Sequence, residues 1–273
     1  MKTPSVAASS ELADRVYLVT GSTRGIGLGI VDGLLARGGR VVINGRDEAT
    51  VREVQSARGD MVAGVVGSVD DDEVVGQCLD AAFGGFGRLD GIVNNVGINA
   101  FHGPLAKIPR SRWDRTMALN LTAPLIIVQQ AVQRGFGKER PGVVVNMSTV
   151  GAQQPQQGIG AYCTSKAALE MLTKVLALEL GAQGIRVNAV APGLVATETS
   201  RKLWEGNAEK LGRARPSGRL GEVVDVAEVT LFLLSDKSEW MTGSVVVVDG
   251  GALLVTGPAA AASDPAIRAE MTT

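Results

Sequence analysis

Seven short runs of apolar, mostly β-branched residues recur along this 273-residue chain, and most of them are apolar on both faces. A strand of this kind is typical of a parallel sheet that helices cover on both sides. The runs lie at residues 15–20, 40–44, 61–66, 89–95, 142–148, 185–191 and 244–249. Between them, helical spacing occurs at about 25–37, 47–57, 71–84, 111–134, 161–181 and 223–235. This alternation predicts an α/β fold with a doubly wound, seven-stranded parallel sheet flanked by helices on both faces.

Because the alternation runs through most of the chain, we expect a single domain over residues 1–256. One polar region, residues 196–220, stands where a strand should pass quickly into a helix. Such an insertion indicates a substrate lid or a plain surface excursion. The last residues, 257–273, are rich in alanine and include two prolines, which predicts a flexible tail.

Charge and composition exclude several classes of function. The chain has 27 basic and 28 acidic residues, a net charge of −1, and no basic run, which argues against nucleic acid or an anionic membrane as partner. No segment approaches the roughly 18 apolar residues of a transmembrane helix, and the first residues lack the apolar core of a signal peptide. Two cysteines, Cys78 and Cys163, and one histidine, His102, give neither a disulfide framework nor a metal site. We therefore expect a cytoplasmic protein without a bound metal.

A glycine-rich turn joins the first strand to the first helix. Gly21, Gly25 and Gly27 have the spacing G-x-x-x-G-x-G. Glycines allow a backbone to approach a pyrophosphate closely, and the free N–H groups of a helix N-terminus favour anions. In isolation such glycines are often turn residues and nothing more. Their place directly after the first strand favours a dinucleotide site.

The end of the second strand bears on the choice of cofactor. A site for NAD usually has an acidic residue there, which binds the ribose 2′-hydroxyl. This chain has Asn44 and then Arg46, and Asp47 follows where it could equally cap the next helix. Arg46 and Arg24 could both reach a 2′-phosphate, which suits the planar guanidinium group. We predict NADP(H), against the alternative that both arginines are solvated surface residues.

Tyr162 and Lys166 are four residues apart in a predicted helix and so share one face of it. A tyrosine hydroxyl has a pKa of about 10 and is a poor base at neutral pH. A nearby positive charge favours the phenolate and so lowers this pKa toward the working range. The plain alternative is a partly buried tyrosine with an exposed lysine.

The motifs occur in a specific order. After the glycine turn come "NNVG" (94–97), "MALNLTAP" (117–124), "NMST" (146–149), "YCTSK" (162–166), "PGLVAT" (192–197) and "MTGSVVVVDGG" (241–251). Over residues 12–254 this order resembles the short-chain dehydrogenase/reductase family in its single-domain form of about 250 residues. The 3-oxoacyl-thioester reductases and the sugar or polyol dehydrogenases are the nearest general likeness. The resemblance implies a Rossmann-type fold.

The resemblance also implies roles for individual residues. Tyr162 would exchange a proton with the substrate oxygen, and Lys166 would hold the nicotinamide ribose and lower the pKa of the tyrosine. Asn120 would hold a water in a proton relay through Lys166. Asn94 and Gly97 would line the adenosine side, while Thr197 and the backbone of Val195 would contact the carboxamide. The candidate cofactor-binding residues are Gly21, Thr23, Arg24, Gly25, Ile26, Gly27, Asn44, Arg46, Ser68, Val69, Asn94, Val96, Gly97, Tyr162, Lys166, Pro192, Gly193, Val195 and Thr197.

Two positions depart from the family pattern. The hydroxyl residue, normally serine, stands 13 positions before the tyrosine, where this chain has Thr149, with Ser148 one place earlier. Neighbours at a strand end point in opposite directions, so we expect only one to face the substrate and favour Thr149, whose methyl would take room in the pocket. The second departure is Ser68 followed by Val69, where the family often has Asp-Val near the adenine.

Together these observations predict an NADP(H)-dependent oxidoreductase that interconverts a ketone and a secondary alcohol, with Tyr162 as general acid or base. The alternatives are an epimerase or dehydratase of the same fold and a non-catalytic dinucleotide-binding sensor. The resemblance further implies a homo-oligomer, a tetramer or a dimer. Gln153 and Gln154 could bind a polar substrate, or they could belong to a solvated loop. Trp204 could close over the substrate or pack the lid against the body of the protein.

Overall fold

A parallel sheet of seven strands forms the centre of the computed structural model, which describes residues 12–255. The strand order is β3-β2-β1-β4-β5-β6-β7, and all neighbours are parallel. The strands are β1 (Val16–Val19), β2 (Arg40–Gly45), β3 (Val62–Val66), β4 (Gly91–Asn94), β5 (Gly142–Met147), β6 (Ile185–Pro192) and β7 (Val245–Val248). The order turns back on itself between β1 and β4, which makes the sheet doubly wound. This confirms the predicted α/β, Rossmann-type fold; the predicted tail lies outside the described residues.

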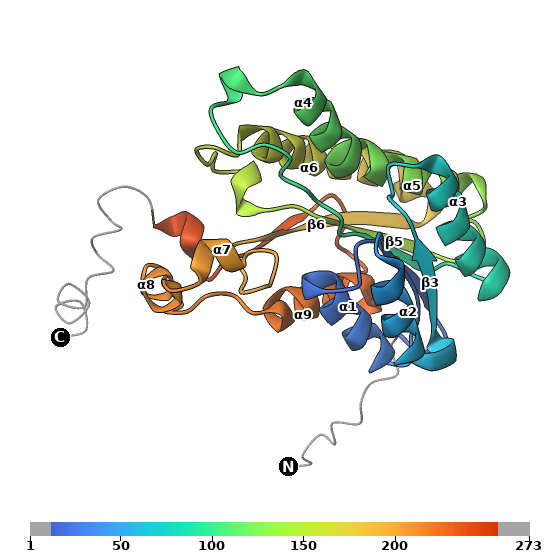
Figure 1. The fold of residues 1–273 in the computed structure, drawn as a ribbon. Helices are drawn as coiled ribbons and strands as arrows, with labels where there is room; N and C mark the ends of the chain where they lie inside the picture. Colours follow the sequence, from blue (N-terminus) through green and yellow to red (C-terminus); the bar gives the residue numbers. More distant parts are fainter. Residues whose placement is uncertain (1–11, 256–273) are drawn as a thin grey trace, which may run out of the picture.

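Helices cover both faces of the sheet (Figure 1). On one face lie α1, α2 and α9, and on the other lie α3, α5 and α6, with α4 packed against α6. Their bounds are α1 (Gly25–Leu35), α2 (Glu48–Ser56), α3 (Asp72–Asp80), α4 (Arg110–Met117), α5 (Ala123–Gln133), α6 (Gly160–Leu180) and α9 (Val223–Leu234). The apolar spacing predicts these helices within a few residues at each end, except that α4 and α5 are expected as one helix over 111–134.

The sheet separates two hydrophobic cores. In β1, Val16 and Leu18 belong to the core under α3, α5 and α6, whereas Tyr17 and Val19 belong to the core under α1, α2 and α9. All four side chains are buried. Because consecutive side chains of a strand point to opposite faces, a strand covered on both sides must be apolar at every position. This is the physical origin of the runs seen in the sequence.

Three local features were not predicted. The polar region 196–220 contains two short helices, α7 (Arg201–Trp204) and α8 (Ala208–Arg213). A π-helical turn extends α3 over Ala81–Gly85, and another joins α4 to α5 over Ala118–Thr122. Such turns contain one residue more than an α-helical turn and are frequent at functional sites.

None of the helices within residues 12–255 is both long enough and apolar enough to span a bilayer. The same residues contain no cluster of three or more His, Cys, Asp or Glu side chains placed to bind a metal ion.

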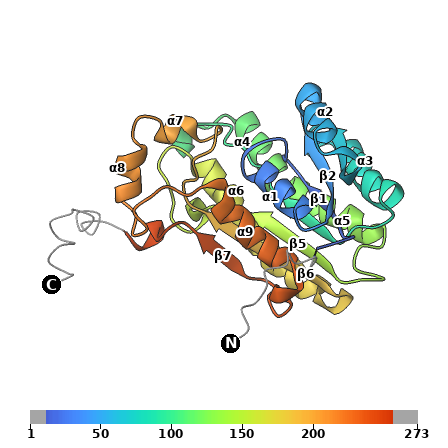
Figure 2. The ribbon, with the colours of Figure 1, turned by 90° about the horizontal axis from the view of Figure 1, so that it is seen from below.

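The contact between α1 and α9 gives a test of the packing (Figure 2). A Cβ at Gly29 would lie 2.2 Å from Cγ1 of Val223, a β-branched side chain that cannot swing away. We expect Gly29→Ala to lower the free energy of unfolding by about 1–3 kcal/mol, measured by urea denaturation. In the control, Gly76→Ala in α3, the new methyl is 3.6 Å from its nearest neighbour, so the substitution should raise that free energy by about 0.5–1 kcal/mol. Equal effects of the two substitutions would contradict this account of the helix contact.

Candidate active site

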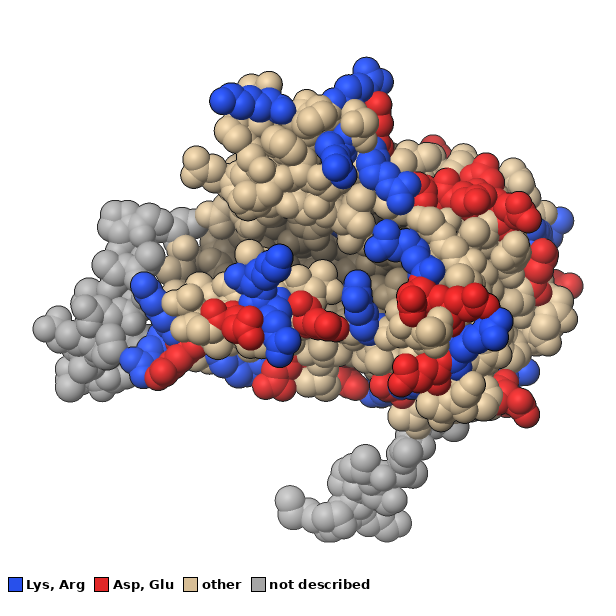
Figure 3. Space-filling view, in the orientation of Figure 1, with Lys and Arg blue, Asp and Glu red and all other residues tan. Residues whose placement is uncertain are grey.

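The candidate residues gather at the carboxyl edge of the sheet. In a parallel sheet, the loops that follow the strands all leave from this edge, and ligands bind where the strand order reverses. Here β1 and β4 flank that point, and the loops after β2, β5 and β6 adjoin it. Figure 3 shows a hollow on this side of the molecule, with Lys and Arg side chains along its rim.

The glycine turn after β1 is tightly closed. Gly21 and Gly25 have φ angles of +59° and +56°, which other residues rarely adopt. A Cβ at Gly27 would lie 2.5 Å from the carbonyl oxygen of Gly21 and 2.6 Å from Nδ2 of Asn95. Asn95 itself donates to the carbonyls of Thr20 and Gly21, each at 2.9 Å. Asn95 lies in the "NNVG" motif, but its bonds to backbone carbonyls leave no signal in the sequence that would mark it as a site residue.

At the end of β2, Asn44 serves the fold. It is buried, its Nδ2 donates to the carbonyls of Val65 at 3.3 Å and Gly67 at 3.1 Å, and its backbone N–H donates to Oγ of Ser22 at 3.1 Å. Asp47 caps α2, where its carboxylate accepts a backbone N–H at 2.8 Å. This helix-capping role is one of the two that the sequence left open for Asp47.

The side chains of Arg24 and Arg46, unlike those of Asn44 and Asp47, have no hydrogen-bond partner among the described residues. Both side chains are exposed, and within the part of the chain that the structure describes neither guanidinium forms an ion pair or a side-chain hydrogen bond. Arg24 precedes the first residue of α1, and Arg46 follows Gly45, at which a Cβ would lie 2.6 Å from Cγ2 of Thr23 in the glycine turn. Two unpaired guanidinium groups at a helix N-terminus suit a phosphate group.

On the expected adenosine side, two side chains are engaged with the protein. The hydroxyl of Ser68 donates to the carboxylate of Asp70, and Val69 after it is buried. Asn94 is also buried, and its Nδ2 donates to Oδ1 of Asn146 on β5 at 2.8 Å. The side chain of Asn94 therefore joins β4 to β5, while Gly97, which is expected with it on the adenosine side, is exposed.

Tyr162 and Lys166 lie in the first two turns of α6, as predicted, but the pKa of the tyrosine differs from the expectation. Lys166 is 2% exposed, its Nζ donates to the carbonyl of Met147 at 2.7 Å, and burial lowers its pKa to about 8. Tyr162 is half-buried as a side chain, and burial of its hydroxyl raises its pKa to about 12, with a smaller upward effect of Cys163. The expected lowering of the tyrosine pKa by Lys166 is thus absent in this structure, because burial dominates and disfavours the cation as well as the phenolate.

The structure separates the two candidate hydroxyls. Ser148 is buried and its Oγ donates to Oε1 of Glu170 at 2.8 Å, away from the tyrosine. Thr149 is the one of the two that affects Tyr162, because its hydroxyl lowers the pKa of the phenol, although burial outweighs this effect. The different surroundings of Ser148 and Thr149 agree with the alternation of side chains at a strand end.

Asn120 lies in the π-helical turn Ala118–Thr122 and is fully buried. Its Oδ1 accepts from the N–H of Ile98 at 2.8 Å, and its Nδ2 donates to the carbonyl of Ile98 and to Oγ of Ser165, both at 2.9 Å. Ser165 lies between Tyr162 and Lys166 in sequence, so Asn120 ties the loop after β4 to the start of α6. One acceptor position of Oδ1 remains for a further donor.

The loop after β6 reaches across the glycine turn. A Cβ at Gly25 would lie 3.8 Å from the side chain of Thr197. Nε1 of Trp204 donates to the carbonyl of Thr197 at 3.2 Å and to Oγ of Ser200 at 3.1 Å. Trp204 thus fastens α7 to this loop. Val195 in this loop is buried. Pro192 ends β6, and the N–H of Gly193 donates to the carbonyl of Val248 at the end of β7 at 2.9 Å.

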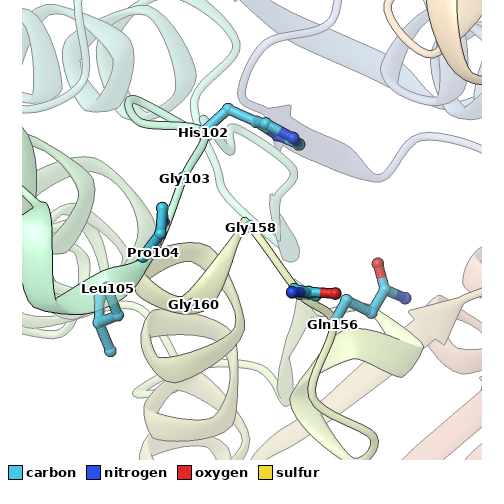
Figure 4. Close-up of a pocket in the computed structure, with 8 residues that line it drawn as sticks. His102, Gly103, Pro104, Leu105, Gln156, Gly158 and Gly160 are labelled. Atoms are coloured by element: carbon cyan, nitrogen blue, oxygen red, sulfur yellow. The ribbon is translucent and has the colours of Figure 1, made fainter.

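A cavity of about 650 Å³ opens between the loop after β4 and the loop before α6 (Figure 4). His102 lines it from the first loop, and Gln156 and Gln157 line it from the second. A Cβ at Gly151, two residues after Thr149, would lie 3.8 Å from the carboxamide carbon of Gln156. The glutamines that line this cavity are Gln156 and Gln157, whereas Gln153 and Gln154 from the same loop are not among its lining residues.

Comparison with known proteins agrees with this geometry. Residues 21–252 match a family model described as enoyl-(acyl carrier protein) reductase. The chain is 40% identical over 246 residues to an L-xylulose reductase of Bos taurus, which covers 89% of this chain and 98% of the relative. It is 35% identical to a 3-oxoacyl-[acyl-carrier-protein] reductase of Haemophilus influenzae, over 88% of this chain and 98% of the relative. A solved short-chain type dehydrogenase/reductase from Mycobacterium ulcerans superposes with a TM-score of 0.81 at 32% identity, over 89% and 90% of the two chains.

The burial of Lys166 predicts a pH dependence of stability in the cofactor-free protein. The pKa of Lys166 is about 8 in the fold and 10.5 in the unfolded chain, so between these values the unfolded chain binds the proton and the fold does not. Stability must then rise with pH in this window, by up to about 1.4 kcal/mol per pH unit. Lys166→Met removes this contribution, so the difference in free energy of unfolding between wild type and variant should grow in favour of wild type from pH 8 to 10.5.

Urea titrations at a series of pH values measure that difference. The control is Lys174→Met, which removes an exposed lysine from the same helix and should follow the wild type. Parallel curves for wild type and Lys166→Met would show that Lys166 is not desolvated as described.

Proposed function

The chain belongs to the short-chain dehydrogenase/reductase family, and we propose that it is an NADP(H)-dependent oxidoreductase that reduces a ketone to a secondary alcohol. One observation carries the proposal. Tyr162 and the buried Lys166 lie at the start of α6, and Thr149, which follows β5, is near enough to Tyr162 to lower the pKa of its phenol.

The residues at this edge fit a dinucleotide. A side chain at Gly27 would collide with the carbonyl of Gly21, and a Cβ at the exposed Gly97 would lie 3.2 Å from Nζ of Lys166. Because neither position carries a side chain, a ligand can approach the backbone at both. The turn and the N-terminus of α1 would hold the pyrophosphate, Arg24 and Arg46 a 2′-phosphate, and Thr197 and Val195 the carboxamide. When bound, the nicotinamide supplies the hydride.

The protonation of the site favours reduction. Because burial raises the pKa of Tyr162 to about 12, the phenol keeps its proton at neutral pH. A neutral phenol can donate to the oxygen of a carbonyl as that oxygen gains negative charge, and Thr149 can donate to the same atom. Asn120 bonds the hydroxyl of Ser165, which itself donates to the backbone carbonyl of Tyr162, and the remaining acceptor of Asn120 is where a proton relay would begin.

The cavity supports a small, uncharged substrate that carries hydroxyl groups. Its lining offers the amides of Gln156 and Gln157 and the imidazole of His102, with glycine, proline and leucine as the other residues. No Lys, Arg, Asp or Glu is among them, so the cavity suits hydrogen bonding to a neutral molecule better than binding of an anion. The similarity to an L-xylulose reductase points to the same chemistry.

We also propose that the protein is a cytoplasmic homo-oligomer. Met171 and Leu178 on α6 are 59% and 85% exposed, and Trp240, before the edge strand β7, is 99% exposed. Large apolar side chains exposed at two separate places are typical of surfaces that a second copy covers. Free cysteines at Cys78 and Cys163 agree with a reducing compartment.

Tyr162→Phe tests the proton donor. We expect the variant to bind NADPH as the wild type does, because the ring is retained, and to lose about 10²–10⁴-fold in kcat, because no group of similar reach supplies the proton. Binding is measured by fluorescence titration and turnover by loss of NADPH absorbance with keto sugars, cyclic diketones and 3-oxoacyl thioesters. Undiminished turnover in the variant would refute the assignment. NADPH binding with no turnover of any substrate by the wild type would favour an epimerase, dehydratase or sensor.

Arg24→Gln and Arg46→Gln test the cofactor preference. Loss of a charged hydrogen bond to the 2′-phosphate should raise the Kd for NADPH about 10- to 100-fold in at least one variant and in the double variant, and leave the Kd for NADH unchanged. Arg140→Gln, at an exposed arginine before β5, is the matched control, because it lies at the opposite edge of the sheet. Equal affinity of the double variant and the wild type for NADPH would show that both arginines are surface residues.

A further inference from the structure

One stripe of α6 that meets the end of β5 is polar, where the inward face of a helix is usually apolar. Lys166, Glu170 and Thr173 are spaced i, i+4 and i+7, so they lie in one row along the helix. Lys166 and Thr173 are buried, and Glu170 is partly buried. Leu169 and Leu176 on the same helix are buried too, so this row of polar side chains is not a solvated face.

Each member of this polar stripe forms a hydrogen bond with a different residue at the end of β5, and the three bonded residues are consecutive in the chain. The bonds run from Nδ2 of Asn146 to Oγ1 of Thr173 at 2.9 Å, from Nζ of Lys166 to the carbonyl of Met147 at 2.7 Å, and from Oγ of Ser148 to Oε1 of Glu170 at 2.8 Å. Three bonds from one helix to one strand end limit how far the helix can slide or turn against the strand.

The bond of Lys166 differs from the other two, because its nitrogen also lies beside an open position. An ammonium group has three donors, and the carbonyl of Met147 uses one of them. A Cβ at the exposed Gly97 would lie 3.2 Å from Nζ, so a ligand that approaches this glycine reaches the lysine as well. The bond between Ser148 and Glu170, in contrast, joins two side chains that the proposed reaction does not use.

We propose that Glu170 is a positioning residue: through Ser148 it holds the first turns of α6 on the end of β5, so that Lys166 can bond a ligand beside Gly97 without a shift of the helix. The inference rests on the proposed function for its kinetic consequences, whereas its structural part concerns the cofactor-free protein. Glu170 lies one turn after Lys166, so the bond to Ser148 acts close to the residues whose place it fixes.

Amide hydrogen exchange of the cofactor-free protein tests the structural part. Glu170→Ala removes the acceptor, so the amides of residues 164–168 should exchange about five- to twentyfold faster than in the wild type, because this part of α6 opens more often. Glu170→Gln retains an acceptor oxygen of the same reach and should exchange as the wild type does. The matched control, Glu179→Ala, removes an exposed glutamate from the same helix and should leave these amides unchanged. Equal exchange in Glu170→Ala and the wild type would overturn the proposal.

A double-mutant cycle identifies the partner of the glutamate. Ser148→Ala removes the donor and should accelerate exchange of the same amides by a similar factor. The double variant Ser148→Ala/Glu170→Ala should then exchange less than about twofold faster than either single variant, because the two substitutions break one bond. If the two factors multiply instead, the side chains act independently and the proposed pair is wrong.

Steady-state kinetics with NADPH and a ketone test whether this bond positions the site. At a temperature where every variant is folded, Glu170→Ala should lower kcat about five- to twentyfold, because Tyr162 and Lys166 lose their fixed place. The KM for the ketone should stay within about twofold, because the polar side chains that line the cavity are not on α6. Glu170→Gln should restore kcat to within about twofold of the wild type. A kcat of Glu170→Ala equal to that of the wild type would refute the positioning role.

The exchange measurement and the kinetic measurement fail separately. If the wild type turns over no ketone, the proposed function is wrong, and the exchange rates still decide whether Glu170 holds α6 on β5. If the wild type reduces ketones but exchange is the same in Glu170→Ala, the reductase stands and the role of Glu170 is overturned.

Discussion

Beyond the strand ends, at the carboxyl edge of the sheet, backbone N–H and C=O groups no longer bond to a neighbouring strand and need other hydrogen-bond partners. Asparagine side chains supply several of these partners. A carboxamide both donates and accepts, so one side chain can satisfy the N–H and C=O groups of a loop. Asn44 bonds the backbone after β3, Asn95 bonds the glycine turn, and Asn120 bonds both polar groups of Ile98. Without these bonds the loops would have no fixed course, and neither the turn nor the tyrosine would have a fixed place.

The same edge contains groups that the interior disfavours. Lys166 is buried with one carbonyl partner, and Asn94 has a buried Oδ1 without a hydrogen-bond partner among the described residues. Burial of such groups lowers the stability of a fold, and they persist where function needs them. The stability that offsets them comes from the two apolar cores on either side of the sheet.

The sequence predicted the strands and long helices because their signal is burial, which repeats along the chain. The helices of residues 196–220 are too short to show a period, and a π-helical turn changes the period by only one residue. Tyr162, Lys166 and the glycine turn could be selected because their residue types and spacing are visible in the sequence itself. The role of Asn95 could not, because its partners are backbone carbonyls that any sequence has. The choice between Ser148 and Thr149, and the direction of the tyrosine pKa, depend on three-dimensional neighbours: Glu170 for the serine, and the burial of the phenol.

The π-helical turn Ala118–Thr122 has a consequence for how this chain can diverge. It adds one residue to the helical run from α4 to α5, and each residue of a helix turns the following part by about 100°. Loss of a single residue there would restore a regular helix and rotate Asn120 away from Ile98, although every named site residue would still be present. In an alignment, a one-residue gap at this place would therefore identify a descendant whose motifs are intact but whose loop after β4 is no longer tied to α6.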